Sequence, residues 1–144
     1  MGKKILAVVV GYVVMAGFVF LSFTIAYLAM GTEGAFEPGV YDVSMLWILT
    51  SIVLGLIAAV LGGLVCVLVA RSQQAAQILA GIVLALGLLL AVVEMTSGAE
   101  KPTVRDSEVS SMDAMQSAKQ PPWVAFLNPL LGAAGVMIGA RLKK

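Results

Sequence analysis

The sequence contains no histidine and only one cysteine, and 12% of its residues carry a charge. The missing histidine removes the most common general base of enzymes, the most common metal ligand and the usual axial ligand of haem. The lone cysteine, Cys66, lies in an apolar segment, where we expect a small packing residue. Glycine-rich phosphate loops, paired cysteines, and the motifs of zinc proteases and serine hydrolases are also missing. We therefore expect a protein that is not an enzyme and that uses no metal and no cofactor.

The abundant residues are the apolar ones. Of the 144 residues, 60% are hydrophobic, whereas a soluble domain is nearer to half apolar and about a quarter charged. The composition predicts an integral membrane protein with one domain that spans residues 1–144. Because no basic run with interleaved aromatic residues occurs, we expect no nucleic acid partner.

Four apolar stretches cover most of the chain, at about residues 5–30, 43–70, 75–96 and 123–140. About 20 residues of helix cross a hydrocarbon core of about 30 Å, so each stretch is close to or above the required length. The first stretch is too long for the apolar part of a secretory signal peptide, and we interpret it as a retained helix. The fold class expected is all-α, a four-helix transmembrane bundle.

The polar segments between these stretches differ in their charges. Residues 97–122 form one long polar outer loop, in which Val109, Met112 and Met115 are spaced for the apolar side of a short surface helix. Lysine and arginine are concentrated in the two ends of the chain and in the turn between the second and third stretches. The six basic residues of this group are Lys3, Lys4, Arg71, Arg141, Lys143 and Lys144, against three in the other loops, Lys101, Arg105 and Lys119. The positive-inside rule then predicts that both termini are cytoplasmic, in a multi-pass protein of the cell inner (cytoplasmic) membrane.

Small residues recur at helical spacing in the second and fourth stretches. Gly55, Ala59 and Gly63 are four residues apart, and a second set follows the dipeptide Asn128-Pro129. This second set consists of Gly132, Gly135 and Gly139. Small residues at this spacing let helix backbones approach closely. We expect all six residues to pack against other helices, with stretch 43–70 at the centre of the bundle.

Polar residues inside the stretches gather in their outer halves. We expect Thr50, Ser51, Glu94 and Asn128 to form an outer pocket with a closed inner end, serving as a contact point for a ligand or partner. A pore would need polar groups along its whole length. Two alternatives remain open: the hydroxyl groups bond back to carbonyls of their own helices, and Glu94 reaches the lipid headgroups.

Two stretches of the sequence have a tryptophan near their start and many glycines and alanines after it. One is the second stretch, with Trp47, and the other is the last stretch, which reads WVAFLNPLLGAAGVMIGARL from Trp123 on. In this pattern the chain resembles small four-span bacterial inner-membrane proteins of hypothetical type, whose function is unknown. The resemblance rests on packing motifs and implies a fold without implying an activity. Small multidrug transporters differ, because they carry a membrane-embedded glutamate in the first helix and residues 5–30 contain none. The polar pore signature of fluoride channels is also missing.

Two functional hypotheses follow. The first is a non-enzymatic structural or accessory membrane protein, such as a small subunit or assembly factor of a larger membrane complex or a homo-oligomer. The second is a small binding or transport protein whose outer pocket takes a lipid-like or small polar ligand. Both hypotheses make the lipid bilayer the immediate surroundings of the chain.

Overall fold

The computed structural model describes residues 1–38, 41–96 and 121–143. Helices account for nearly all of them: α1 (Gly2–Ala35), α2 (Met45–Ala70), α3 (Gln73–Thr96) and α5 (Pro122–Arg141). Each of the four is long and apolar enough to cross a membrane. The all-α fold with four candidate membrane spans is thus confirmed. The surface helix expected around Val109 to Met115 lies outside the described residues.

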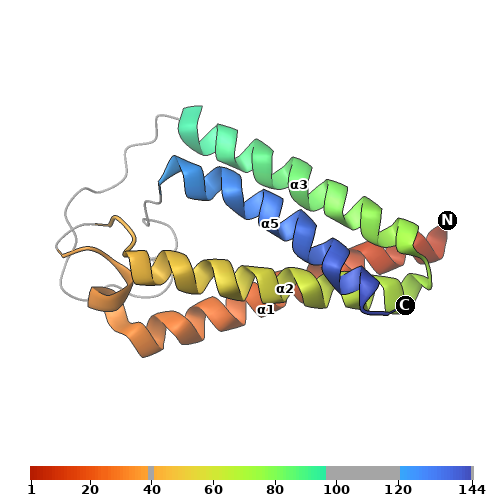
Figure 1. Cartoon of the computed structure of the whole chain (residues 1–144), viewed down its shortest axis with the longest axis horizontal. Helices are drawn as coiled ribbons and strands as arrows, with labels where there is room; N and C mark the ends of the chain where they lie inside the picture. Colours follow the sequence, from red (N-terminus) through yellow and green to blue (C-terminus); the bar gives the residue numbers. More distant parts are fainter. Residues whose placement is uncertain (39–40, 97–120, 144) are drawn as a thin grey trace.

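The four helices form a bundle that is closed at one end and open at the other (Figure 1). The N-terminus and the end of α5 lie together at one end, called here the terminal end; the end at which α1 joins α2 is called the loop end. Helix α2 packs mainly on α1 and α5, and α3 packs mainly on α5. Toward the loop end, α3 and α5 diverge from α1 and α2 (Figure 1).

At the loop end, a short connection holds α1 and α2 together. Helix α1 runs five residues beyond the predicted end at Met30, with one break at Gly31, whose φ of 72° only glycine adopts without strain. Ser44 then caps α2: its Oγ accepts from the backbone N–H of Trp47 at 3.1 Å and donates to the carbonyl oxygen of Gly34 at 2.6 Å. One hydroxyl group therefore connects the ends of both helices.

Aromatic rings reinforce this connection. The ring of Trp47 in α2 meets Tyr27 and Phe23 of α1 edge to face, with centroids 6.3 and 5.7 Å apart. Tyr27 also meets Phe36 edge to face at 6.4 Å, and its hydroxyl is 2.8 Å from the Thr32 hydroxyl. Such contacts stabilise aromatic pairs beyond the burial of their area. The α1–α2 pair is consequently fixed at the end where the other two helices diverge.

At the terminal end, a tight turn and two side-chain bonds draw the helices together. Arg71 ends α2 in the left-handed conformation (φ 53°, ψ 35°), which lets α3 begin two residues later. The Gln73 side-chain amide donates to the carbonyl oxygen of Ala140 in α5 at 2.8 Å, and Lys4 of α1 hydrogen-bonds Gln74. Three of the helices are thus joined at this end by the first two residues of α3.

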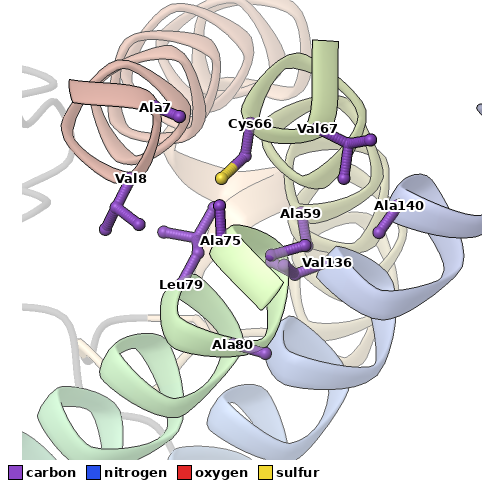
Figure 2. Close-up of a cluster of buried hydrophobic side chains, with 11 residues drawn as sticks. Ala7, Val8, Ala59, Cys66, Val67, Ala75, Leu79, Ala80, Val136 and Ala140 are labelled. Carbon is purple, nitrogen blue, oxygen red and sulfur yellow. The ribbon is translucent and has the colours of Figure 1, made fainter. Parts of the chain in front are cut away.

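The core of the terminal half consists almost entirely of small side chains (Figure 2). Leu79 is the largest of them, and both Leu79 and Cys66 are fully buried. The remaining members are Ala7, Val8, Ala59, Val67, Ala75, Ala76, Ala80, Val136 and Ala140. Since these side chains occupy little space, the helix backbones come close together, as small residues allow in membrane bundles.

Several predicted packing residues lie at these close approaches. A Cβ on Gly63 would overlap the backbone carbonyl of Val136, and one on Gly139 would overlap the carbonyl of Val60. A Cβ on Gly135 would lie 2.6 Å from that of Ala59. The α2–α5 crossing therefore depends on glycine on both of its sides.

Gly132 and Gly55, the remaining predicted packing residues, differ in how closely another helix approaches them. On the α3 side of α5, a Cβ on Gly132 would lie 2.9 Å from Cγ1 of Val83. Gly55 differs from the expectation, because a Cβ there would have nothing within 4 Å. The reason is that the α1–α2 pair and the α3–α5 pair diverge toward the loop end, which leaves Gly55 on the wall of a cavity.

Two further close approaches were not predicted as such. Gly11 of α1 faces Gly62 of α2, where a Cβ on either residue would lie 2.9 to 3.0 Å from the other's carbonyl oxygen. Gly87 of α3 lies against the ring of Pro129 of α5. Helix α3 packs mainly on α5 and less extensively on α2.

Candidate functional site

A cavity of about 360 Å³ occupies the opening between the helix pairs at the loop end. All four helices contribute to this cavity, called here the cleft. Its walls are formed by Met15, Val19 and Phe23 of α1, Ser51, Ile52, Gly55 and Leu56 of α2, Val83, Gly87, Leu90, Ala91 and Glu94 of α3, and Ala125, Asn128, Pro129, Leu131 and Gly132 of α5. The volume lies in the range of small-molecule binding sites.

Three of the four predicted contact residues line the cleft, each from a different helix. They are Ser51 of α2, Glu94 of α3 and Asn128 of α5. Glu94 is two residues from the end of α3, and both Glu94 and Asn128 are exposed. These positions bring a carboxyl, an amide and a hydroxyl group to the loop-end part of one cavity.

Thr50 is the exception among the predicted contacts. Its hydroxyl donates to the carbonyl oxygen of Leu46 in the same helix at 2.8 Å, and its side chain is not part of the cleft wall. Thr50 is turned by about 100° from Ser51 around the axis of α2 and lies outside the cleft wall. Ser51 also bonds back to its own helix, at 2.8 Å from the Ile48 carbonyl oxygen, as the alternative interpretation of such hydroxyls predicts.

The inner end of the cleft is closed. Met15 occupies the space beside Gly62, and the ring of Pro129 fills the space beside Gly87. Beyond them lies the small-residue core of the terminal half (Figure 2). The cleft is therefore bounded by packed side chains on the side of the terminal half.

The chemistry of the cleft wall suits binding. A carboxyl group accepts hydrogen bonds, and an amide both accepts and donates them. Lysine and arginine do not contribute to the described wall, and most of its residues are apolar. No group of three histidine, cysteine, aspartate or glutamate side chains suited to a metal ion occurs in residues 1–38, 41–96 and 121–143. The arrangement can hold an amphipathic molecule with its polar group toward Glu94 and Asn128.

The cleft wall also includes residues that the sequence analysis did not select. Phe23 and Gly55 were absent from the predicted contacts, although Phe23 lies close to Ser22 and Thr24 in the outer half of its helix. An apolar wall residue gives no signal in a sequence where 60% of the residues are hydrophobic. The polar residues were recognisable because they are rare within the spans.

Comparisons of the chain with protein-family models, with curated proteins and with solved structures give no match. The functional conclusion below is therefore based on the geometry and chemistry of the cleft.

Proposed function

We propose that this chain is a non-enzymatic multi-pass membrane protein that binds one amphipathic, lipid-like molecule in the cleft. The observation that carries the proposal is the convergence of Ser51, Glu94 and Asn128 on a single recess with otherwise apolar walls. Ligand sites combine such apolar walls with a few polar groups that fix orientation. The closed inner end supports binding in preference to passage across the membrane.

The charges of the wall define the polar group of the ligand. Glu94 is the ionisable residue of this wall. A carboxylate accepts hydrogen bonds, and the amide of Asn128 both accepts and donates them. We therefore propose a ligand whose polar end donates hydrogen bonds, through hydroxyl or amine groups, with its apolar part along Leu90 and Leu131.

The distribution of charge supports an orientation with cytoplasmic termini. Among the described residues, all lysines and arginines lie near the terminal end: Lys3, Lys4, Arg71, Arg141 and Lys143. The acidic ones lie toward the loop end: Glu33, Glu37, Asp42 and Glu94. Under the positive-inside rule the cleft then opens in the outer leaflet of the cytoplasmic membrane.

Native mass spectrometry of the protein in mild detergent tests the binding function. The wild-type protein should retain one small amphiphile, and Asn128→Leu and Glu94→Gln should each lower the retained fraction. Thr50→Val is the matched control, because it removes a polar group from the same level of α2 without touching the cleft. An empty wild-type protein, or equal retention in Asn128→Leu and Thr50→Val, would contradict the proposal.

An accessory role in a larger complex is the second candidate, and a surface of α3 favours it. Gln77, Gly81 and Ala85 are spaced four residues apart and are all exposed. A Cβ on Gly81 would have nothing within 4 Å, so a helix of another chain has room to approach there. Small residues beside a polar amide are typical of contacts between membrane helices.

Co-purification separates the two candidates. If α3 docks a helix of a partner subunit, Gly81→Leu should release that subunit and leave the retained amphiphile unchanged. If the cleft alone carries the function, Gly81→Leu should behave as wild type in both measurements.

A further inference from the structure

A second hollow lies at the opposite end of the bundle from the cleft. It has a volume of about 520 Å³ and is located where the α2–α3 turn meets the residues after α5. Its walls are formed by Val67, Leu68, Arg71, Ser72, Gln73 and Lys143. We call it the basic hollow, because two of these six residues are cations and none is an acid.

The charge of the basic hollow is not neutralised by nearby acids of the described chain. Within residues 1–38, 41–96 and 121–143, the acidic side chains are located toward the loop end. Lys3, Lys4 and Arg141 add further positive charge at the terminal end. Arg71 and Lys143 are both exposed. A positive hollow at the end of a membrane-spanning bundle lies at the level of lipid headgroups and attracts anionic ones.

The backbone at the base of the basic hollow is preorganised by hydrogen bonds within the chain. Arg71 is fixed at the end of α2, where its backbone N–H donates to the carbonyl oxygen of Val67 at 2.7 Å. The Gln73 amide holds the start of α3 against α5 through its 2.8 Å bond to the Ala140 oxygen. The two elements that carry the cations are therefore joined to each other, which lowers the entropy lost on binding.

One wall of the basic hollow is apolar and faces outward. Leu68 is 46% exposed in the last turn of α2, directly before Arg71. Because α2 is a candidate membrane span, this side chain lies where the hydrocarbon of the bilayer begins. The hollow thus places an apolar contact on the membrane side of two cations and the Ser72 hydroxyl.

We propose that the basic hollow binds the phosphate group of an anionic phospholipid from the leaflet at the terminal end. Arg71 and Lys143 hold the phosphate oxygens, with Arg71 suited to a bidentate contact. The first carbons of an acyl chain lie along Leu68. This site is independent of the cleft, because the two have no wall residue in common.

Lipid titration of the purified protein, read by native mass spectrometry, tests this site. Phosphatidylglycerol should bind more tightly than phosphatidylcholine, and the double variant Arg71→Gln/Lys143→Gln should weaken phosphatidylglycerol binding about tenfold or more. The matched control is Lys3→Gln/Arg141→Gln, which removes two charges from the same end outside the hollow. It should change the affinity by less than about threefold, because exposed and separated charges are screened.

Three results would overturn the proposal. The first is an equal loss of affinity in both double variants, which would indicate general surface charge. The second is displacement of phosphatidylglycerol by inorganic phosphate at millimolar concentration, which would indicate a site for free anions. The third is wild-type affinity for phosphatidylglycerol in Arg71→Gln/Lys143→Gln, which lacks both cations of the hollow. Glu94→Gln, which alters only the cleft, should leave phosphatidylglycerol binding unchanged.

Discussion

The ring of Pro129 in α5 packs into the space beside Gly87 of α3, where a Cβ would lie only 2.5 Å from Cγ of the proline. Both residues also form part of the cleft wall. This contact therefore sets the separation of α3 and α5 at the level where the cleft begins. The sequence shows a proline within a helical stretch, and the structure shows the residue that accommodates its ring.

Gly87→Leu should destabilise the protein, because the added side chain meets the buried proline ring. Overpacking of this kind costs typically about 1–3 kcal/mol. The measurement is thermal unfolding in detergent, with Gly81→Leu as the control on the same helix, where the space is open. Equal melting temperatures for the two variants would show that the ring does not constrain position 87.

Gly63→Ala should also destabilise the protein, and Gly55→Ala should not. A Cβ at position 63 overlaps the backbone carbonyl of Val136, which cannot move without shifting α5, whereas position 55 has nothing within 4 Å. The same unfolding measurement compares these two glycines of one helix. A variant at Gly55 that is as unstable as the one at Gly63 would contradict the placement of the cleft.

Ser44→Ala should loosen the joint between α1 and α2. The variant loses the cap of α2 and the 2.6 Å bond to the Gly34 carbonyl, and loss of such a cap costs about 0.5–2 kcal/mol. Ser22→Ala is the control, because its hydroxyl contacts only the Val19 carbonyl in its own helix at 3.4 Å. The two variants are compared by hydrogen exchange of residues 32–44, which should become faster in Ser44→Ala alone.

The orientation of the bundle can be tested by labelling single cysteines in a Cys66→Ala background. Pro38→Cys at the loop end should react with a membrane-impermeant reagent added outside intact cells. Leu142→Cys at the terminal end should react only after the cells are opened, because the positive-inside rule predicts cytoplasmic termini. The reverse pattern of labelling would refute the orientation and would place the cleft in the inner leaflet.

The sequence was sufficient to predict the four candidate spans and the location of both chain ends at one end of the bundle (Figure 1). Long runs without charge indicate membrane helices, and an even number of spans returns the chain to the side where it started. The helix ends were less predictable. The end of α1 past Gly31 is held by Ser44, whose Oγ donates to the Gly34 carbonyl oxygen and whose N–H donates to that of Ala35, and these bonds form only when the two helices meet.

The polar part of the cleft could be predicted better than its shape. Ser51, Glu94 and Asn128 are conspicuous in apolar helices, and three helices bring them to one recess. The place of Gly55 could not be predicted, since spacing alone assigns it to the same packing row as Ala59 and Gly63. Which glycine of a row meets another helix depends on the angle between helices, and that angle is set by distant contacts such as Gly87 with Pro129.

Filling the cleft from Gly55 is the most direct test of its role as a binding site. Gly55→Phe should occupy the recess from the α2 wall, and Gly17→Phe adds the same side chain to α1 where a Cβ has nothing within 4 Å. The measurement is the amount of amphiphile retained per protein in native mass spectrometry, with the melting temperature of each variant recorded alongside. The proposed function predicts that Gly55→Phe loses the bound molecule while Gly17→Phe and the wild-type protein keep it. Equal retention in all three proteins would contradict binding in the cleft.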